Sequence, residues 1–243
     1  MQTRAILLDI EGTTTPISFV HDVLFPYSRL HLESFLSQHG DSSEVAFDLA
    51  LLSEEHMVDV SEGREPQRLV APYVYWLMDR DRKSPALKSL QGKIWQQGYE
   101  DGSLRSLVFA DVRPAMERWR SKNLNVSIFS SGSELAQKLL FAHSDTGDLT
   151  KFISNYFDTG VGKKTNADSY RRIAAALSLT AHQIHFISDI LNELNAAADA
   201  GMETSLCIRP GNPIQPSSSR HPIIHNFDEL GESGLTSTQA SDK

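Results

Sequence analysis

The sequence predicts an α/β fold: a doubly wound parallel sheet that carries a helical domain as an insert. Two observations predict the sheet, namely short apolar segments rich in β-branched residues and amphipathic helical segments between them. Continuous apolar runs are typical of strands that helices cover on both faces, and strands that alternate with helices form parallel sheets. A third observation, a long helical stretch after the first strand, predicts the insert.

Four segments are predicted as strands of this Rossmann-like sheet. They are residues 4–9, 125–131, 183–189 and 203–209. Helices are predicted at 133–143 and 166–180, because apolar residues recur there at spacings of three and four and form one apolar stripe. Strands and helices therefore alternate along the second half of the chain.

The connection between the first two strands is too long for a simple crossover and contains several amphipathic helical patterns. These patterns cover residues 21–38, 44–55, 68–81 and 84–100. We therefore predict a helical cap domain at 17–105, and a core domain formed by 1–16 and 106–231. The polar, Ser/Thr-rich segment 232–243 is predicted to be a disordered tail.

Composition limits the class of protein. The chain has 243 residues, of which 40% are hydrophobic and 22% charged, as in ordinary soluble globular proteins. Its formal net charge of −8 argues against nucleic-acid and anionic-membrane surfaces, which bind basic patches. The single cysteine, Cys207, permits no intramolecular disulfide, and no apolar run approaches the ~18 residues of a membrane span. We expect a cytoplasmic monomer whose partner is a small molecule, with no nucleic acid and no membrane.

Two acids, Asp9 and Glu11, stand at the end of the first predicted strand and precede Gly12. Residues two apart in a strand point to the same side, so both carboxylates are expected to project together at the C-terminal edge of the sheet. Open α/β sheets place their ligand sites at that edge. Two like charges this close are unfavourable unless a cation lies between them or one carboxyl stays protonated. The alternative is an exposed loop that happens to begin with acids.

The other predicted strands also end in polar residues. Ser130 and Ser131 precede a helix, so they could form an anion site at its N-terminus or merely cap it. Asp189 ends the third strand and is either a metal ligand or a helix cap. Lys163 and Lys164 follow glycines in the preceding stretch, and the residues alone do not choose between them.

These oxygen ligands suit Mg²⁺, which prefers carboxylates and water. The histidines are scattered and form no zinc pattern. The sequence contains no G-x-G-x-x-G, Walker A or G-x-S-x-G motif, so dinucleotide, P-loop and serine-hydrolase sites lack their signatures.

The motifs, in this order, resemble those of the haloacid dehalogenase superfamily of aspartyl phosphotransferases, in which a helical cap follows the first motif. The resemblance extends over roughly residues 4–210 and implies a haloacid dehalogenase-like core. The form "DIEGTTTP" (9–16), with glutamate where most members have a second aspartate, is similar to the enolase-phosphatase family of methionine salvage. Further agreement comes from "SSGSELAQKLLFAHSDTGDLT", "YFDTGVGKK", "SDILNELNAA" and "IRPGN".

The resemblance implies a role for each motif residue. Asp9 would be the nucleophile and a metal ligand, Glu11 an acid associated with the metal and placed to handle protons, and Asp189 the remaining ligand of one Mg²⁺ per subunit. The residues implied for the substrate phosphate are Ser130, Ser131 and Lys164. Lys164 is selected by the alignment of the second lysine of "GVGKK" with the family's lysine.

Members of that family enolise 2,3-diketo-5-methylthiopentyl 1-phosphate and then hydrolyse it to 1,2-dihydroxy-3-keto-5-methylthiopentene and phosphate. Asp9 would attack phosphorus, and Glu11 is the candidate base for the enolisation. Three alternatives stay open: a general phosphate monoester phosphatase, a dehalogenase that needs no metal, and a non-catalytic binding protein on the same fold. The presence of all four motifs disfavours the last.

Overall fold

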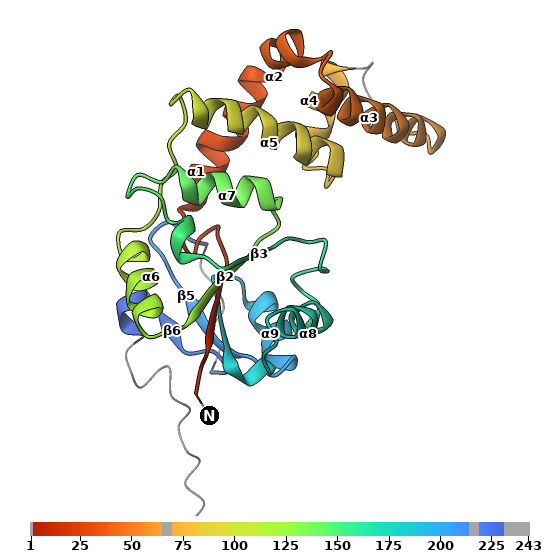
Figure 1. Ribbon diagram of the computed structural model, residues 1–243. Helices are drawn as coiled ribbons and strands as arrows, with labels where there is room; N and C mark the ends of the chain where they lie inside the picture. The colour runs from red at the N-terminus through yellow and green to blue at the C-terminus, as the bar shows by residue number, and fades with distance from the viewer. Residues whose placement is uncertain (1, 65–69, 214–218, 231–243) are drawn as a thin grey trace, which may run out of the picture. The chain divides into compact units, whose positions relative to one another are not determined.

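The computed structural model describes residues 2–64, 70–213 and 219–230 (Figure 1). The predicted tail, 232–243, lies outside the described residues. The chain divides into two compact units, which we call the core unit (Met1–Val20 with Arg105–Lys243) and the helical unit (His21–Leu104). The sequence places the boundaries of the insert at 17 and 105.

The described part of the core unit contains a six-stranded, wholly parallel sheet with the order β3-β2-β1-β4-β5-β6. The strands are β1 (Ala5–Leu8), β2 (Asn125–Phe129), β3 (Asn155–Phe157), β4 (Ile184–Ser188), β5 (Glu203–Cys207) and β6 (Ile223–Ile224). The strand order reverses beside β1, because the chain moves outward from β1 to β3 and then returns to place β4 on the other side of β1. Ligands bind outside the carboxyl ends of strands at such a switch point. The doubly wound α/β fold is confirmed.

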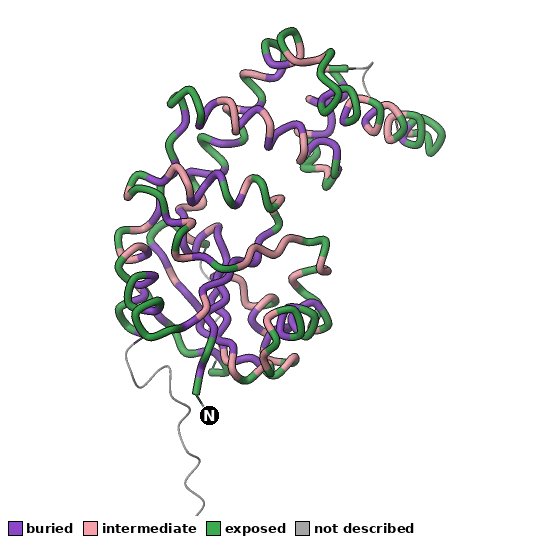
Figure 2. Tube along the Cα trace, in the orientation of Figure 1, coloured by how far each residue is buried: buried purple, intermediate pink, exposed green. Residues whose placement is uncertain are grey.

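Helices cover both faces of this sheet, with α6 and α8 on opposite sides (Figure 1). They are α6 (Val112–Ser121), α7 (Glu134–Ala142), α8 (Ala167–Ala176) and α9 (Leu191–Asp199), preceded by a short α1 (Ile17–Phe19). All four residues of β1 are fully buried, as the continuous apolar run predicts (Figure 2). One cluster joins Leu7 of β1 and Phe186 of β4 to Tyr170 and Ile173 of α8 and Leu194 of α9.

The helix predicted at 166–180 ends earlier than its apolar stripe suggests. Helix α8 stops at Ala176 because Ser178 has a φ of +55°, a left-handed conformation that helices cannot continue through. The N–H of Leu179 then donates to the carbonyl of Ala174 and closes the end of the helix. The apolar residues after the break still pack against the core.

The helical unit is built from four helices among its described residues, after a π-helical segment (Val20–Leu24). They are α2 (Phe25–His39), α3 (Ser43–Ser61), α4 (Ala71–Met78) and α5 (Pro85–Glu100). Proline occupies the first turn of α5, where its missing N–H costs nothing, and Ser84 caps that turn by accepting from the N–H of Leu87. Leu32, Leu52 and Leu90 lie in the unit's own apolar core.

A membrane-spanning helix needs about 18 or more mostly apolar residues, and no helix in the described ranges combines that length with that composition.

Candidate active site

The chain makes a tight turn directly after β1, and this turn carries the first two predicted acids. The N–H groups of Thr13, Thr14 and Thr15 all donate to the carbonyl of Ile10, at 3.2, 3.0 and 3.0 Å. Gly12 has a φ of +69°, and a Cβ added there would lie 2.4 Å from Oδ2 of Asp189. Glycine is therefore required twice, for its backbone conformation and for the close approach of the Asp189 carboxylate.

Asp9 is buried at the carboxyl end of β1, with 4% of its surface exposed. Its Oδ1 accepts from the N–H of Ile10 at 2.8 Å and from Nζ of Lys164 at 2.5 Å. Its Oδ2 accepts from the hydroxyl of Ser188, at the end of β4, at 3.2 Å. Hydrogen bonds of this kind hold the carboxylate in one orientation.

Lys164 is the lysine that the structure places beside Asp9, whereas Lys163 is exposed. Its Nζ also lies 2.6 Å from Oε2 of Glu193, so one ammonium joins two carboxylates. Burial lowers the pKa of Lys164, but the negative charges of Asp9 and Glu193 outweigh it and hold that pKa above its usual value. Lys164 is therefore a fixed cation in the site.

Asp189 follows β4 and is 3% exposed. Burial, together with the nearby charges of Asp9 and Glu193, raises the pKa of Asp189 to about 7. The N-cap position of α9 belongs to Ile190, so Asp189 does not cap that helix, which was its alternative role.

The charge balance of this cluster fits a divalent cation. Lys164 pairs with Asp9 and Glu193, and the negative charges of these two acids also raise the pKa of Asp189. Repulsion among the three carboxylates is what a bound cation would relieve. Within the described residues, no three acids, histidines or cysteines converge as a complete ligand set. Mg²⁺ does not need one, because it commonly takes one or two carboxylates and completes its shell with water and substrate phosphate.

Glu11 lies in the same turn, two residues after Asp9, and is half-buried. Its backbone pairs with Thr15, which fixes where its side chain leaves the turn. The structure thus keeps Glu11 at the carboxyl edge of the sheet together with Asp9.

The serines after β2 lie at the same edge of the sheet. Ser130 is 5% exposed, and its N–H donates to the carbonyl of Phe157 in β3 at 3.1 Å. Ser131 is exposed. Helix α7 is capped by Ser133, whose hydroxyl accepts from the N–H of Ala136. The cap of α7 is therefore Ser133 and not one of the two predicted serines, and the hydroxyl of Ser130 accepts from the N–H of Gly132 at 3.2 Å.

Two residues complete the cluster beyond those predicted as site residues. Ser188 donates its hydroxyl to Asp9 or to Glu193, whose Oε2 lies 3.1 Å away, and accepts from the N–H of Ile190. The sequence leaves the role of Glu193 open, although its position one helical turn after Asp189 is the signal that points to it. A serine at the last position of a buried strand carries no comparable signal.

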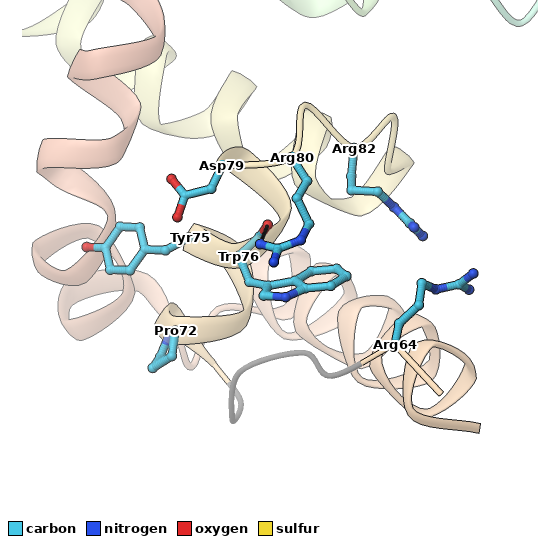
Figure 3. A pocket seen from close by; sticks show the side chains of 7 residues that line it. All are labelled: Arg64, Pro72, Tyr75, Trp76, Asp79, Arg80 and Arg82. Carbon is cyan, nitrogen blue, oxygen red and sulfur yellow. Dashed lines mark hydrogen bonds between the residues drawn. The ribbon is translucent and has the colours of Figure 1, made fainter. Parts of the chain in front are cut away.

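A separate pocket of about 800 Å³ lies within the helical unit (Figure 3). Its wall is formed by Arg64, Pro72, Tyr75, Trp76, Asp79, Arg80 and Arg82. The buried carboxylate of Asp59 accepts from Arg64 at 2.6 Å and from Arg82 at 3.1 Å. Two of the three guanidinium groups are thus held by ion pairs, and the third stacks on Trp76 at 4.4 Å. This pocket contains none of the predicted site residues.

Comparisons with known proteins show the family to which the chain belongs. Residues 3–201 match the family model for haloacid dehalogenase-like hydrolases. The enolase-phosphatase E1 of Synechococcus elongatus is 49% identical over 230 residues, covering 93% of this chain and 96% of that protein. That of Sorangium cellulosum is 45% identical over 233 residues, covering 95% and 98%.

Solved structures extend the comparison to the fold. The crystal structure of the UTR4 protein from Saccharomyces cerevisiae is 36% identical, has a TM-score of 0.77, and covers 94% of this chain and 100% of that one. The chain therefore belongs to the haloacid dehalogenase-like hydrolases and, among them, to the enolase-phosphatase E1 family.

Proposed function

We propose that this protein is a Mg²⁺-dependent enolase-phosphatase of methionine salvage. It converts 2,3-diketo-5-methylthiopentyl 1-phosphate to 1,2-dihydroxy-3-keto-5-methylthiopentene and phosphate, and acts as a cytoplasmic monomer on this small molecule. The observation that carries the proposal is the buried contact of Asp9 with Lys164 at the switch point of the sheet, in a chain with enolase-phosphatase relatives over nearly its whole length.

The phosphatase step is assigned to Asp9. One carboxylate oxygen forms a bond to phosphorus as the bond from phosphorus to the substrate oxygen breaks, and the leaving oxygen takes a proton. Water then attacks the aspartyl phosphate, which releases phosphate and restores the carboxylate. Lys164 offsets the charge of the phosphoryl oxygens, and the hydroxyls of Ser130 and Ser131 are the proposed hydrogen-bond donors to them.

A divalent cation would be held by Asp9 and Asp189, with Glu11 beside them. When bound, it would neutralise phosphoryl charge and polarise the diketone oxygens. The buried, mutually repelling carboxylates of Asp9 and Asp189 support this assignment.

The enolase step needs a base beside the carbon that bears the phosphate. Glu11 is the proposed base, because it lies next to the nucleophile and is not fully buried. It removes a proton from that carbon, the neighbouring carbonyl oxygen gains one, and the net change is an isomerisation.

A phosphate-release assay with and without EDTA tests the proposal, using the wild type and Asp9→Asn. Both EDTA and the substitution are expected to abolish turnover, the substitution by on the order of 10³-fold or more. Activity that survives either change would contradict the mechanism. A rise in the enol's ultraviolet absorbance before phosphate release distinguishes an enolase-phosphatase from a general phosphatase.

A further inference from the structure

Three consecutive carbonyls of the turn after β1 are held by groups that come from distant parts of the core unit. The carbonyl of Gly12 accepts from Nδ2 of Asn212 at 2.8 Å, and that of Thr13 accepts from Nε of Arg209 at 3.0 Å. The carbonyl of Thr14 accepts from the N–H of Phe109 at 3.0 Å. The turn that carries Glu11 is thus fixed from outside as well as by its own hydrogen bonds.

Arg209 is held by two aromatic rings and by hydrogen bonds from Nε and Nη1. It is 4% exposed, and its guanidinium lies between the rings of Phe109 and Phe227, at 4.5 and 4.6 Å. Nη1 donates to Oδ1 of Asp111 at 2.9 Å and to the carbonyl of His225 at 3.2 Å. Such a clamp leaves Nε aimed at the turn after β1.

Asp111 completes the support of this guanidinium from the far side. Its Oδ2 accepts from the N–H of Phe227 at 2.6 Å. This bond fixes Phe227, whose ring contacts the guanidinium, relative to the carboxylate that pairs with it. Within the described residues, Nη2 of Arg209 is buried with no hydrogen-bond partner. Burying a guanidinium with an unsatisfied nitrogen is unfavourable, so packing alone is a poor reason for an arginine here.

Asn212 joins two parts of the site. Its Nδ2 donates to the Gly12 carbonyl and lies 3.4 Å from Oδ2 of Asp189. The N–H of Asn212 donates to the carbonyl of Arg209 at 3.1 Å, so both side chains belong to one closed turn, which we call the 209–212 turn. A single amide therefore connects the strand end that carries Asp9 with the strand end that carries Asp189.

We infer that Arg209 and Asn212 are positioning residues for the reaction. The 209–212 turn holds the backbone beside Glu11 through Arg209, and holds Gly12 against the Asp189 carboxylate through Asn212. The inference rests on the proposed function, because it assigns the turn to placing the residues that carry that chemistry. Groups behind metal ligands commonly change metal affinity or activity by about 10- to 100-fold when they are removed.

Mg²⁺ binding, measured by isothermal titration calorimetry without substrate, tests the part played by Asn212. We expect Asn212→Ala to bind Mg²⁺ about tenfold or more weakly than the wild type. Asn226→Ala is the control, because the side chain of Asn226 likewise bonds the backbone, but it accepts from the N–H of Asp228 and does not bond the turn after β1. The control should bind Mg²⁺ as the wild type does.

Arg209→Lys tests the second positioning residue and also serves if Asn212→Ala does not fold. Lysine keeps the charge but cannot hold the Thr13 carbonyl and Asp111 at once, so kcat should fall about tenfold with little change in KM. Arg220→Lys is its control, since Arg220 bonds Asp199 on the surface. A thermal melt of each variant, with all assays well below the lowest melting temperature, separates these effects from loss of stability.

The inference is overturned if Asn212→Ala binds Mg²⁺ within twofold of the wild type, or if Arg209→Lys keeps its kcat while only its melting temperature falls. It is also overturned if the control variants lose as much as the test variants. Failure of the proposed function would give a different result: the wild type would not turn over the diketone phosphate, while the calorimetric effect of Asn212→Ala would still be measurable.

Discussion

At the scale of single residues, the type of a charged residue does not show whether it belongs to the site; its burial and its contacts do. Lys164 and Lys163 are adjacent and chemically identical, yet one contacts Asp9 and Glu193 and the other is exposed. The backbone decides this difference, because the carbonyl of Lys163 accepts from Ser169 and that of Lys164 from Tyr170. Both bonds tie the lysine segment to the first turns of α8, and a single sequence does not reveal them.

Replacing each lysine by methionine tests this asymmetry. Lys164→Met removes the cation that offsets Asp9 and the phosphoryl charge, so we expect kcat/KM for phosphate release to fall on the order of 10³-fold. Lys163→Met is the matched control and should stay within twofold of the wild type. Equal losses in the two variants would show that Lys164 has no special place in the site.

Glu11 allows the two chemical steps to be separated. Glu11→Gln keeps the size of the side chain but removes its basicity, so enolisation should slow by about 10²-fold or more. Hydrolysis of a simple phosphate ester, which needs no carbon base, should slow less. The two rates are compared by the enol's absorbance and by phosphate release. If both fall by the same factor, Glu11 is not a dedicated base.

At the scale of elements, the sequence predicts the four central strands because each is a continuous apolar run. The edge strands β3 and β6 are missed, since β3 has three residues, all half-buried, and β6 only two. Their pairing depends on neighbours rather than on their own pattern. The site residues divide in a similar way. The acids that directly follow strong strands, Asp9 and Asp189, are recognisable in the sequence by their charge. Ser188, a polar residue at the end of β4, and Asn212 make contacts across the fold that no local pattern encodes.

Replacing Gly12 by alanine tests whether the turn after β1 needs glycine, and Gly63→Ala is the control. Their φ angles, +69° and +72°, are nearly equal, but no atom of the described residues lies within 4 Å of a Cβ at Gly63. Gly63→Ala should therefore show the backbone cost alone, about 1–2 kcal/mol of unfolding free energy. Gly12→Ala should lose the same unfolding free energy. Its Cβ should also push the Asp189 carboxylate away, which should weaken Mg²⁺ binding about tenfold.

Chemical denaturation gives the two stabilities, and calorimetry gives the metal affinity. A Gly12→Ala variant that loses stability as Gly63→Ala does, but binds Mg²⁺ normally, would show that the close approach to the Asp189 carboxylate is unimportant.

At the scale of the whole molecule, a histidine buried in the sheet links the free energy of unfolding to pH. His185 lies in β4, and its Nε2 is 2.8 Å from the hydroxyl of Ser205 in β5. Burial lowers the pKa of His185 to about 4. The carboxylate of Glu203 lies 3.7 Å from Nδ1, but it is about a third exposed and too well solvated to offset that burial.

The unfolded chain therefore binds a proton at His185 near the ordinary histidine pKa of about 6.5, while the folded protein does not until about pH 4. Between these values the unfolded state holds more protons, so the free energy of unfolding falls as the pH drops, by up to about 3 kcal/mol from this residue. Above pH 7 the residue contributes no pH dependence.

Urea denaturation at several pH values between 7 and 4.5 measures this effect. As the pH drops, the free energy of unfolding should decline less steeply for His185→Gln than for the wild type. His182→Gln, at an exposed histidine, is the control and should follow the wild type. A His185→Gln curve parallel to that of the wild type would mean that His185 is not the buried proton acceptor that limits stability in acid.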